Sequence, residues 1–223
     1  MTPGAVRFGP LGDAALLLTF GEGIDPATND RVHHLAGLLR REALPGLRGL
    51  VPAYTTLAVH FDPLVWDHEA LAQELGRLEA APADPVPPRT VVLPVCYGGA
   101  WGPDLEEVAA HCGLAPGEVV ARHCAGVYRV HFLGFAPGFP YLGGLDPALA
   151  TPRRSAPRTL VPAGSVGLAG GQTGIYPLDS PGGWRLIGRT PRVLFDPLRE
   201  EPCLLRAGDL LRFEAVDGFE EAP

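Results

Sequence analysis

The chain contains no lysine, and all 18 of its basic residues are arginines. This absence excludes every mechanism in which the chain itself must supply a lysine. The excluded classes are Schiff-base enzymes, P-loop nucleotide-binding proteins, protein kinases, amidases with a Ser/Ser/Lys site and biotin carriers. Any phosphate or carboxylate must therefore be bound by arginine, by backbone amides or by a partner protein.

Cysteine is scarce, and long apolar runs are missing. The four cysteines, at positions 96, 112, 124 and 203, form no CxxC pair and no spacing typical of a metal site, so we interpret them as packing residues and expect no bound metal. The apolar run at 14–18 is too short to cross a membrane, and no secretory cleavage pattern accompanies it. We expect a cytoplasmic protein with reduced thiols and no membrane segment.

Basic residues are fewer than acidic ones, so the formal net charge is -7 and the pI is about 5.5. An acidic surface argues against binding to nucleic acid or to anionic lipid. Residues 104–123 predict two short helices that resemble a helix-turn-helix, but Glu106, Glu107 and Glu118 would repel a phosphate backbone. We therefore expect no nucleic-acid partner.

The first 80 residues show the pattern of a small α/β unit. Short strands and amphipathic helices follow one another in the order ββαββα, which predicts a small antiparallel sheet with helices on one face. Asp25 and Pro26 indicate the start of a helix that continues to about residue 43, and Asp67 caps a second helix. The expected strands cover residues 6–8, 14–20, 50–53 and 55–61.

A proline-rich stretch, residues 81–89, predicts a linker. We place the boundary there and expect an N-terminal α/β domain at 1–86 and a second domain at 87–223. After residue 125 the pattern is almost entirely one of short strands and glycine or proline turns, which predicts an antiparallel barrel or sandwich. Strands are expected at 192–197 and in a hairpin over 203–213, so the fold class is α+β.

The stretch 131–190 concentrates glycine, proline, aromatic residues and arginine. Arginine suits planar anions, and glycine lets a ligand approach the backbone. The candidate anion-binding residues are the arginines of a proline-rich loop and those after the GGW turn: Arg153, Arg154, Arg158, Arg185 and Arg189. A stacking wall is expected from aromatic residues of the same stretch: Tyr141, Tyr176 and Trp184.

Two polar residues follow the glycine pair of the same stretch. Gln172 and Thr173 are expected to present an amide and a hydroxyl beside exposed backbone N–H groups. Alternatives remain open at this point, because turns select glycine and proline in any β domain, barrels bury aromatic residues, and surface arginines are often only solvated.

Several long blocks in this order and at this spacing resemble one protein family. The blocks are FLGFAPGFPYLGGL, TPRRSAPR, VPAGSVGLAGGQTGIYPLDSPGGW, LIGRTP and LFDP. They are similar to the family variously called the B subunit of 5-oxoprolinase, allophanate hydrolase subunit 1 or KipI-type kinase inhibitor, whose module also forms half of the carboxyltransferase region of urea carboxylase. The likeness covers residues 90–215 and is looser before them.

The resemblance implies a small N-terminal α/β sandwich followed by a cyclophilin-like antiparallel β-barrel. It also implies a heteromeric enzyme, with a C subunit of related barrel fold and with an A subunit, that converts 5-oxo-L-proline, ATP and water to L-glutamate, ADP and phosphate. ATP, with Mg²⁺, would be shared with those partners. His123 lies where the family pattern also tends to carry histidine, so it is one expected catalytic residue. The residues themselves, apart from the resemblance, give Gln172 as the other. They also give the expected substrate or anion-binding residues: Arg153, Arg154, Arg158, Thr173, Tyr176, Trp184 and Arg189.

Two alternatives to this function stay open. One is a regulatory protein that inhibits a sensor histidine kinase, and the other is a carboxyltransferase-like half of a urea carboxylase or allophanate system. Amidase-type hydrolysis of allophanate by this chain is excluded, because that chemistry needs a lysine.

Overall fold

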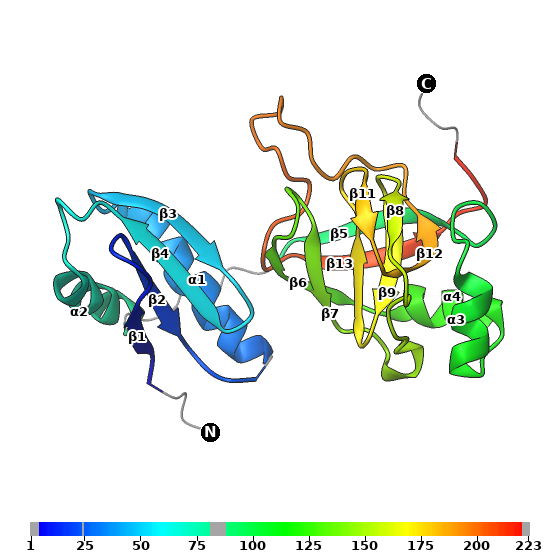
Figure 1. The fold of residues 1–223 in the computed structure, drawn as a ribbon, viewed down its shortest axis with the longest axis horizontal. Helices are drawn as coiled ribbons and strands as arrows, with labels where there is room; N and C mark the ends of the chain where they lie inside the picture. Colours follow the sequence, from blue (N-terminus) through cyan, green and yellow to red (C-terminus); the bar gives the residue numbers. More distant parts are fainter. Residues whose placement is uncertain (1–4, 24, 81–87, 220–223) are drawn as a thin grey trace. The chain divides into compact units, whose positions relative to one another are not determined.

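The chain divides into two compact units, Met1–Pro87 and Pro88–Pro223, here called the N-terminal unit and the barrel unit. The computed structural model describes residues 5–23, 25–80 and 88–219 (Figure 1). Most of the predicted linker, residues 81–87, lies outside the described residues. No helix in the described part of the chain is both long enough and apolar enough to cross a membrane.

The N-terminal unit is a four-stranded antiparallel sheet with two helices against it (Figure 1). Its elements are β1 (Arg7–Pro10), β2 (Ala15–Thr19), α1 (Pro26–Glu42), β3 (Leu47–Pro52), β4 (Thr56–Phe61) and α2 (His68–Glu79). The sheet order is β1-β2-β4-β3. The ββαββα order predicted from the sequence is the order found.

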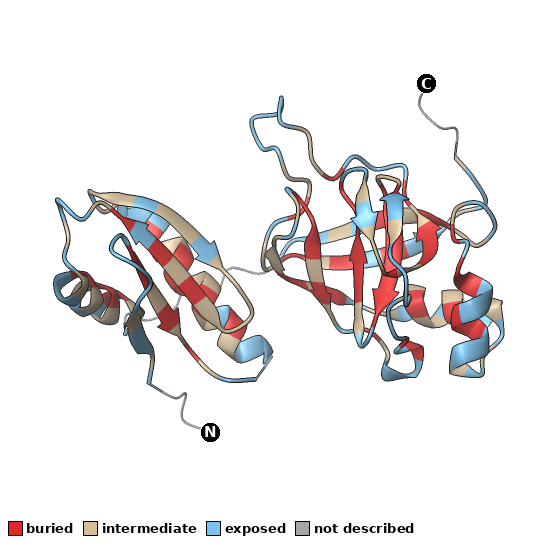
Figure 2. Ribbon diagram, in the orientation of Figure 1, coloured by how far each residue is buried: buried red, intermediate tan, exposed pale blue. Residues whose placement is uncertain are grey.

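Alternation of apolar residues decides which face of this sheet is buried. Leu16 and Leu18 on β2 and Val59 on β4 are 2% exposed or less, and they pack against Leu35 of α1 and Leu71 of α2 (Figure 2). Successive side chains on a strand point to opposite faces, so one face forms the core and the other meets solvent.

Helix α1 ends at a residue in the left-handed conformation. Ala43 follows the helix with φ 46° and ψ 47°, and its N–H donates to the Leu39 carbonyl. Glycine is favoured at this position, because an L-residue there costs about 1 kcal/mol.

We expect Ala43→Gly to stabilise the N-terminal unit by about 0.5–1 kcal/mol. The matched control, Ala36→Gly in the interior of α1, should destabilise it by at least about 1 kcal/mol. Denaturant unfolding followed through Trp66 fluorescence, with Trp101 and Trp184 replaced by phenylalanine, measures both changes. Destabilisation by Ala43→Gly would contradict this account of the helix end.

The barrel unit is built around a closed barrel of seven strands in the order β10-β7-β6-β13-β5-β12-β9 (Figure 1). Its elements are β5 (Thr90–Tyr97), α3 (Leu105–Cys112), α4 (Pro116–Ala125), β6 (Tyr128–Leu133), β7 (Pro140–Gly143), the short 3-10 helix η1 (Pro147–Leu149), β8 (Arg158–Val161), β9 (Ser165–Ala169), β10 (Gln172–Ile175), β11 (Ser180–Gly182), β12 (Arg185–Arg189) and β13 (Leu210–Ala215). β8 and β11 form a separate two-stranded sheet. The α+β class with a closed barrel, expected from the sequence, is confirmed.

Alternating apolar side chains fill the barrel. Val130, Leu142, Val166, Leu168 and Leu211 are each 1% exposed or less and belong to one continuous core. Helices α3 and α4 pack against the outside of the barrel, on β12 and β13 respectively. The core therefore holds the strands rigidly, and the loops between them are free to carry a site.

Two details of the barrel differ from the sequence-based expectation. β13 pairs with β5 in parallel, from Leu210↔Thr90 to Ala215↔Val95, whereas the other pairs are antiparallel. The strands expected at 192–197 and 203–206 are not formed, and only an isolated bridge joins Phe195 to Cys203. Prolines at 191, 197 and 202 interrupt this region, and proline cannot donate to a strand ladder.

Candidate active site

A cavity of about 350 Å³ in the barrel unit is the candidate site. It lies between the β6–β7 loop, the arginine-rich loop before β8, and β11. Its lining residues are Phe135, Phe139, Tyr141, Arg153, Arg154, Pro157, Tyr176, Pro181, Gly182, Gly183 and Trp184. Ligand pockets span about 300–1,000 Å³, so this one suits a small molecule.

Buried aromatic rings form one wall of this cavity. Phe139 packs edge to face against three rings, with centroid distances of 5.3 Å to Tyr141, 5.5 Å to Tyr176 and 5.6 Å to Trp184. A Cβ added at Gly174 would lie 2.9 Å from Phe139 Cζ, so only glycine lets the strand approach the rings this closely. The predicted stacking wall of Tyr141, Tyr176 and Trp184 is therefore assembled, with Phe139 as its centre.

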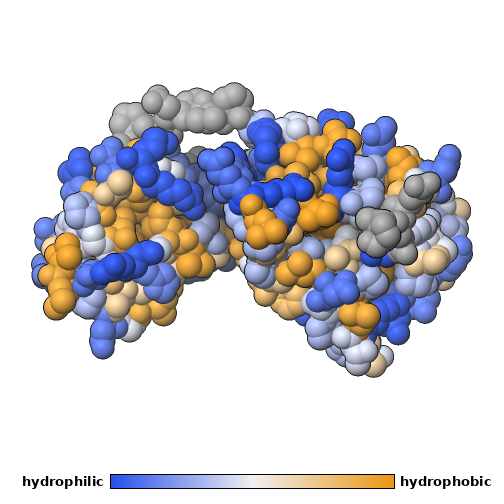
Figure 3. Space-filling view, turned by 90° about the horizontal axis from the view of Figure 1, so that it is seen from above, coloured by the Kyte–Doolittle hydropathy of each residue, from blue (hydrophilic) through white to orange (hydrophobic). Residues whose placement is uncertain are grey.

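Phe135 extends this wall to the surface. It is 67% exposed, its ring lies 5.4 Å from that of Phe139, and its backbone has a φ of 67°, in the left-handed region. On the face of the barrel unit seen in Figure 3, hydrophobic surface lies exposed among hydrophilic side chains. An exposed aromatic residue in a strained backbone conformation is typical of a ligand-contacting loop.

Two of the predicted anion-binding arginines share one carboxylate, that of Asp104. Arg158 donates to both oxygens of Asp104, from Nη1 at 2.9 Å and from Nη2 at 2.8 Å, and Arg154 Nη1 donates to the same carboxylate at 3.0 Å. The Leu186 N–H adds a fourth bond at 2.7 Å. Burial alone would raise the pKa of Asp104, but these bonds and the two positive charges hold that pKa below its ordinary value.

Arg153 differs from its neighbours. It is exposed and lines the cavity, and in the described part of the barrel unit it has no carboxylate partner. Burial is the main cause that raises the pKa of Tyr176, and the positive charge of Arg153 acts in the opposite direction. Arg153 is therefore the guanidinium that is available to an anion over the aromatic wall.

The arginines of β12 lie outside the cavity. Arg185 forms an ion pair with Glu107. Arg189, predicted to bind an anion, donates from Nε to the Ala163 carbonyl at 2.8 Å and stacks on Trp101, with 5.6 Å between the guanidinium carbon and the ring centroid. The structure does not bring Arg189 to the pocket.

His123 does not fit the catalytic role expected for it. Its side chain is fully buried in the barrel core and stacks on Phe213, with 4.5 Å between the ring centroids. Tyr97 Oη lies 2.8 Å from its Nδ1, and Thr173 Oγ1 lies 3.0 Å from its Nε2. Burial lowers the pKa of His123 to about 3, so the ring is neutral and has no access to a substrate.

The hydrogen bonds of Thr173 fix the tautomer of this histidine. The Thr173 hydroxyl donates to the Gly167 carbonyl at 3.2 Å, so it must accept from His123, whose Nε2 carries the proton. Nδ1 of the neutral ring then accepts from the Tyr97 hydroxyl. Thr173, predicted to contact substrate, is likewise 0% exposed, and both residues hold the barrel together.

Gln172 is not one of the lining residues. It is half-buried at the start of β10, where the β9–β10 hairpin pairs it with Ala169. Of the eleven residues predicted for the site, the cavity brings together Tyr141, Arg153, Arg154, Tyr176 and Trp184. Arg158 is not one of the lining residues and is bound to Asp104.

Sequence reasoning missed the role of Asp104. An aspartate followed three residues later by Glu107 predicts a capping box at the start of α3. In the structure Asp104 makes no side-chain capping bond, and both acids pair with arginines instead. The four acceptor bonds of a buried aspartate are a structural signal that the sequence does not carry.

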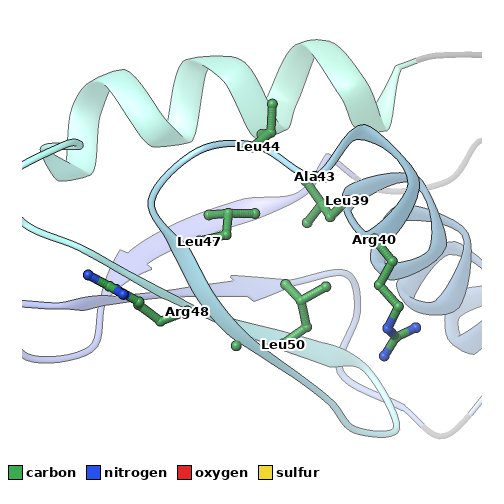
Figure 4. A pocket seen from close by; sticks show the side chains of 8 residues that line it. Leu39, Arg40, Ala43, Leu44, Leu47, Arg48 and Leu50 are labelled. Carbon is green, nitrogen blue, oxygen red and sulfur yellow. The ribbon is translucent and has the colours of Figure 1, made fainter.

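A second cavity, of about 390 Å³, lies in the N-terminal unit between the end of α1 and β3 (Figure 4). Its walls are mainly aliphatic side chains, with Arg40 and Arg48 at its sides. Arg48 is paired with Asp62 at 2.5 Å. Its described lining contains no aromatic ring, no carboxylate and no histidine, so we do not take it as the candidate active site.

In the described part of the chain there is no group of side chains that could hold a metal ion, and the cavity is a poor match for a polyphosphate. Across residues 5–23, 25–80 and 88–219 no three His, Cys, Asp or Glu side chains group in a way that could hold a metal ion. Among its described lining residues the cavity offers one unpaired guanidinium, because Arg154 is bound to Asp104. Several cations or a glycine-rich loop are needed to hold a triphosphate, so ATP is not accommodated by this pocket alone.

Comparison with known proteins agrees with the barrel and its loops. The family described as carboxyltransferase domain, subdomain C and D, matches residues 6–205. The chain therefore belongs to this class of carboxyltransferase-type domains. Its crystallographically known relatives include TTHA0988, which matches with a TM-score of 0.83 at 44% identity over 94% of this chain and 41% of that longer one.

The particular family follows from a curated relative. The B subunit of 5-oxoprolinase from Bacillus subtilis (strain 168) is 46% identical over 218 residues, which is 92% of this chain and 91% of the relative. The chain is a member of the family of 5-oxoprolinase B subunits. The K. lactis urea amidolyase matches with a TM-score of 0.75 at 22% identity over 95% of this chain and 15% of that one, which shows a shared fold alone.

Proposed function

We propose that this protein is the B subunit of an ATP-dependent 5-oxoprolinase, which opens the lactam of 5-oxo-L-proline to give L-glutamate. The single observation that carries the proposal is the 46% identity to the Bacillus subtilis B subunit of 5-oxoprolinase along almost the full length of both chains. The chemistry of the pocket supports it independently.

The substrate would use both halves of the pocket. 5-Oxoproline carries one carboxylate and a planar lactam. Arg153 is the unpaired guanidinium for the carboxylate, with charge-assisted hydrogen bonds. Tyr176 and Trp184 offer flat apolar surface to the lactam ring. One cation and one aromatic wall therefore match a small, flat monoanion.

The pocket lacks the remaining catalytic groups. Its described lining contains no aspartate, glutamate or histidine, and burial raises the pKa of Tyr176. A general base must be able to accept a proton near neutral pH. We infer that the base that assists ring opening and the ATP site, with its Mg²⁺, belong to the partners, a C subunit with a related barrel and an A subunit, and that this chain alone is inactive or nearly so.

Reconstitution tests the proposal. The chain purified with its C and A partners should release ADP in the presence of 5-oxo-L-proline, with one glutamate formed per ADP. Each of the three components alone and each pair should be inactive. If the complete mixture is inert while the chain alone blocks autophosphorylation of a sensor histidine kinase, the proposal is wrong. Activity that depends on biotin would instead support a carboxyltransferase.

A further inference from the structure

The loop that carries Arg153 has little structure of its own. Residues 152–157 form neither helix nor strand, and all of them except Arg154 are exposed. Within the loop, one backbone bond, from the Arg154 N–H to the Gly183 carbonyl at 2.8 Å, joins it to the opposite wall of the cavity. A segment with few buried contacts opens readily unless another group holds it.

Asp104 supplies that group. Its side chain is 2% exposed. It accepts hydrogen bonds from Arg154 in the loop, from Arg158 at the start of β8 and from the Leu186 N–H of β12. One carboxylate thus ties the loop to the barrel. It also forms ion pairs with Arg154 and Arg158, whereas Arg153, which lines the cavity, has no carboxylate partner among the described residues.

We propose that Asp104 is a positioning residue for substrate binding, which acts by fixing the 152–157 loop and the start of β8 so that Arg153 lies beside the aromatic wall. Asp104 does not touch the substrate in this account. The inference rests on the proposed function for its consequence in catalysis, but the positioning of the loop is testable without it.

The catalytic test is a double-mutant cycle in the reconstituted three-component enzyme. Asp104→Asn should raise KM for 5-oxo-L-proline about tenfold and change kcat less than about twofold, because only binding of the carboxylate is weakened. In an Arg153→Gln background the same change should leave KM unaltered. An equal KM penalty in both backgrounds would overturn the proposal, since it would show a general defect rather than one that acts through Arg153.

Amide hydrogen exchange of the full chain tests the positioning itself. Asp104→Asn should speed exchange at residues 153–158, while β9 and β10 keep the wild-type rate. If Asp104→Asn does not fold, Arg158→Lys, which keeps the charge but loses the fork of two bonds, should show the same changes to a smaller extent. Unchanged or uniformly faster exchange would contradict the proposal. An inactive wild-type mixture would count against the proposed function and leave the exchange result to decide on Asp104.

Discussion

Arg153→Gln is expected to raise KM for 5-oxo-L-proline about 100-fold in the reconstituted enzyme, with little loss of stability. Hydrogen bonds to a charged partner contribute about 1.5–3 kcal/mol, and 1.4 kcal/mol corresponds to a factor of ten. Arg153 is exposed, and neither a hydrogen bond nor an ion pair links it to another described residue, so its removal leaves the fold intact. Steady-state kinetics and a thermal melt measure the two effects.

Two matched variants separate recognition from bulk charge. Arg212→Gln removes an exposed guanidinium from β13, outside the pocket, and should leave KM unchanged. Arg158→Gln removes the two-bond partner of the buried Asp104 carboxylate, so it should lower the free energy of unfolding. Equal KM values for the Arg153→Gln enzyme and the wild type would show that Arg153 does not bind the substrate.

The barrel unit is expected to lose about 3 kcal/mol of stability between pH 6.5 and pH 4 because of His123 alone. The folded-state pKa is about 3, whereas the ordinary value is 6.5, so the unfolded state binds more protons in this window, and the excess rises from about half a proton at pH 6.5 to nearly one near pH 5. Stability is fully present above pH 6.5 and falls by about 1.4 kcal/mol for each pH unit below it, until pH approaches the folded value.

Comparison with His123→Gln isolates this contribution. The glutamine variant is less stable at pH 7, because Tyr97 and Thr173 lose well-placed partners, but its stability should fall less steeply between pH 6.5 and pH 4. Denaturant titrations at several pH values give the two slopes. Parallel slopes for both proteins would contradict a buried neutral histidine, and a kcat that follows His123 ionisation would restore its catalytic role.

Local patterns in the sequence were enough to predict the helices and strands of the N-terminal unit and their order. Alternation in β2 and β4 and the Asp25 cap of α1 are short-range signals, and the expected element order is the order found. The barrel closes by a contact that no local pattern reveals. β13 pairs in parallel with β5, for example Phe213 with Leu93, about 120 residues away, so alternation predicts the strand but not its neighbour.

The residue types of the candidate site could be predicted from the sequence, but the contacts between its side chains could not. Arginines and aromatic residues between 131 and 190 indicate an anion-binding surface, and Arg153, Tyr176 and Trp184 do line one cavity. Asp104 lies some fifty residues before its arginine partners, so the sequence does not show with which arginines it pairs. For His123, the family resemblance marks the position, and only the fold shows that it is buried.

The assignment of the cavity to the substrate is tested most directly by a crystal structure of the complete enzyme with 5-oxo-L-proline. The ligand should lie in the barrel unit of this protein, with its carboxylate on the Arg153 guanidinium and its ring against Tyr176 and Trp184. A ligand bound elsewhere in the assembly, with this cavity occupied by a partner's side chains, would contradict the account.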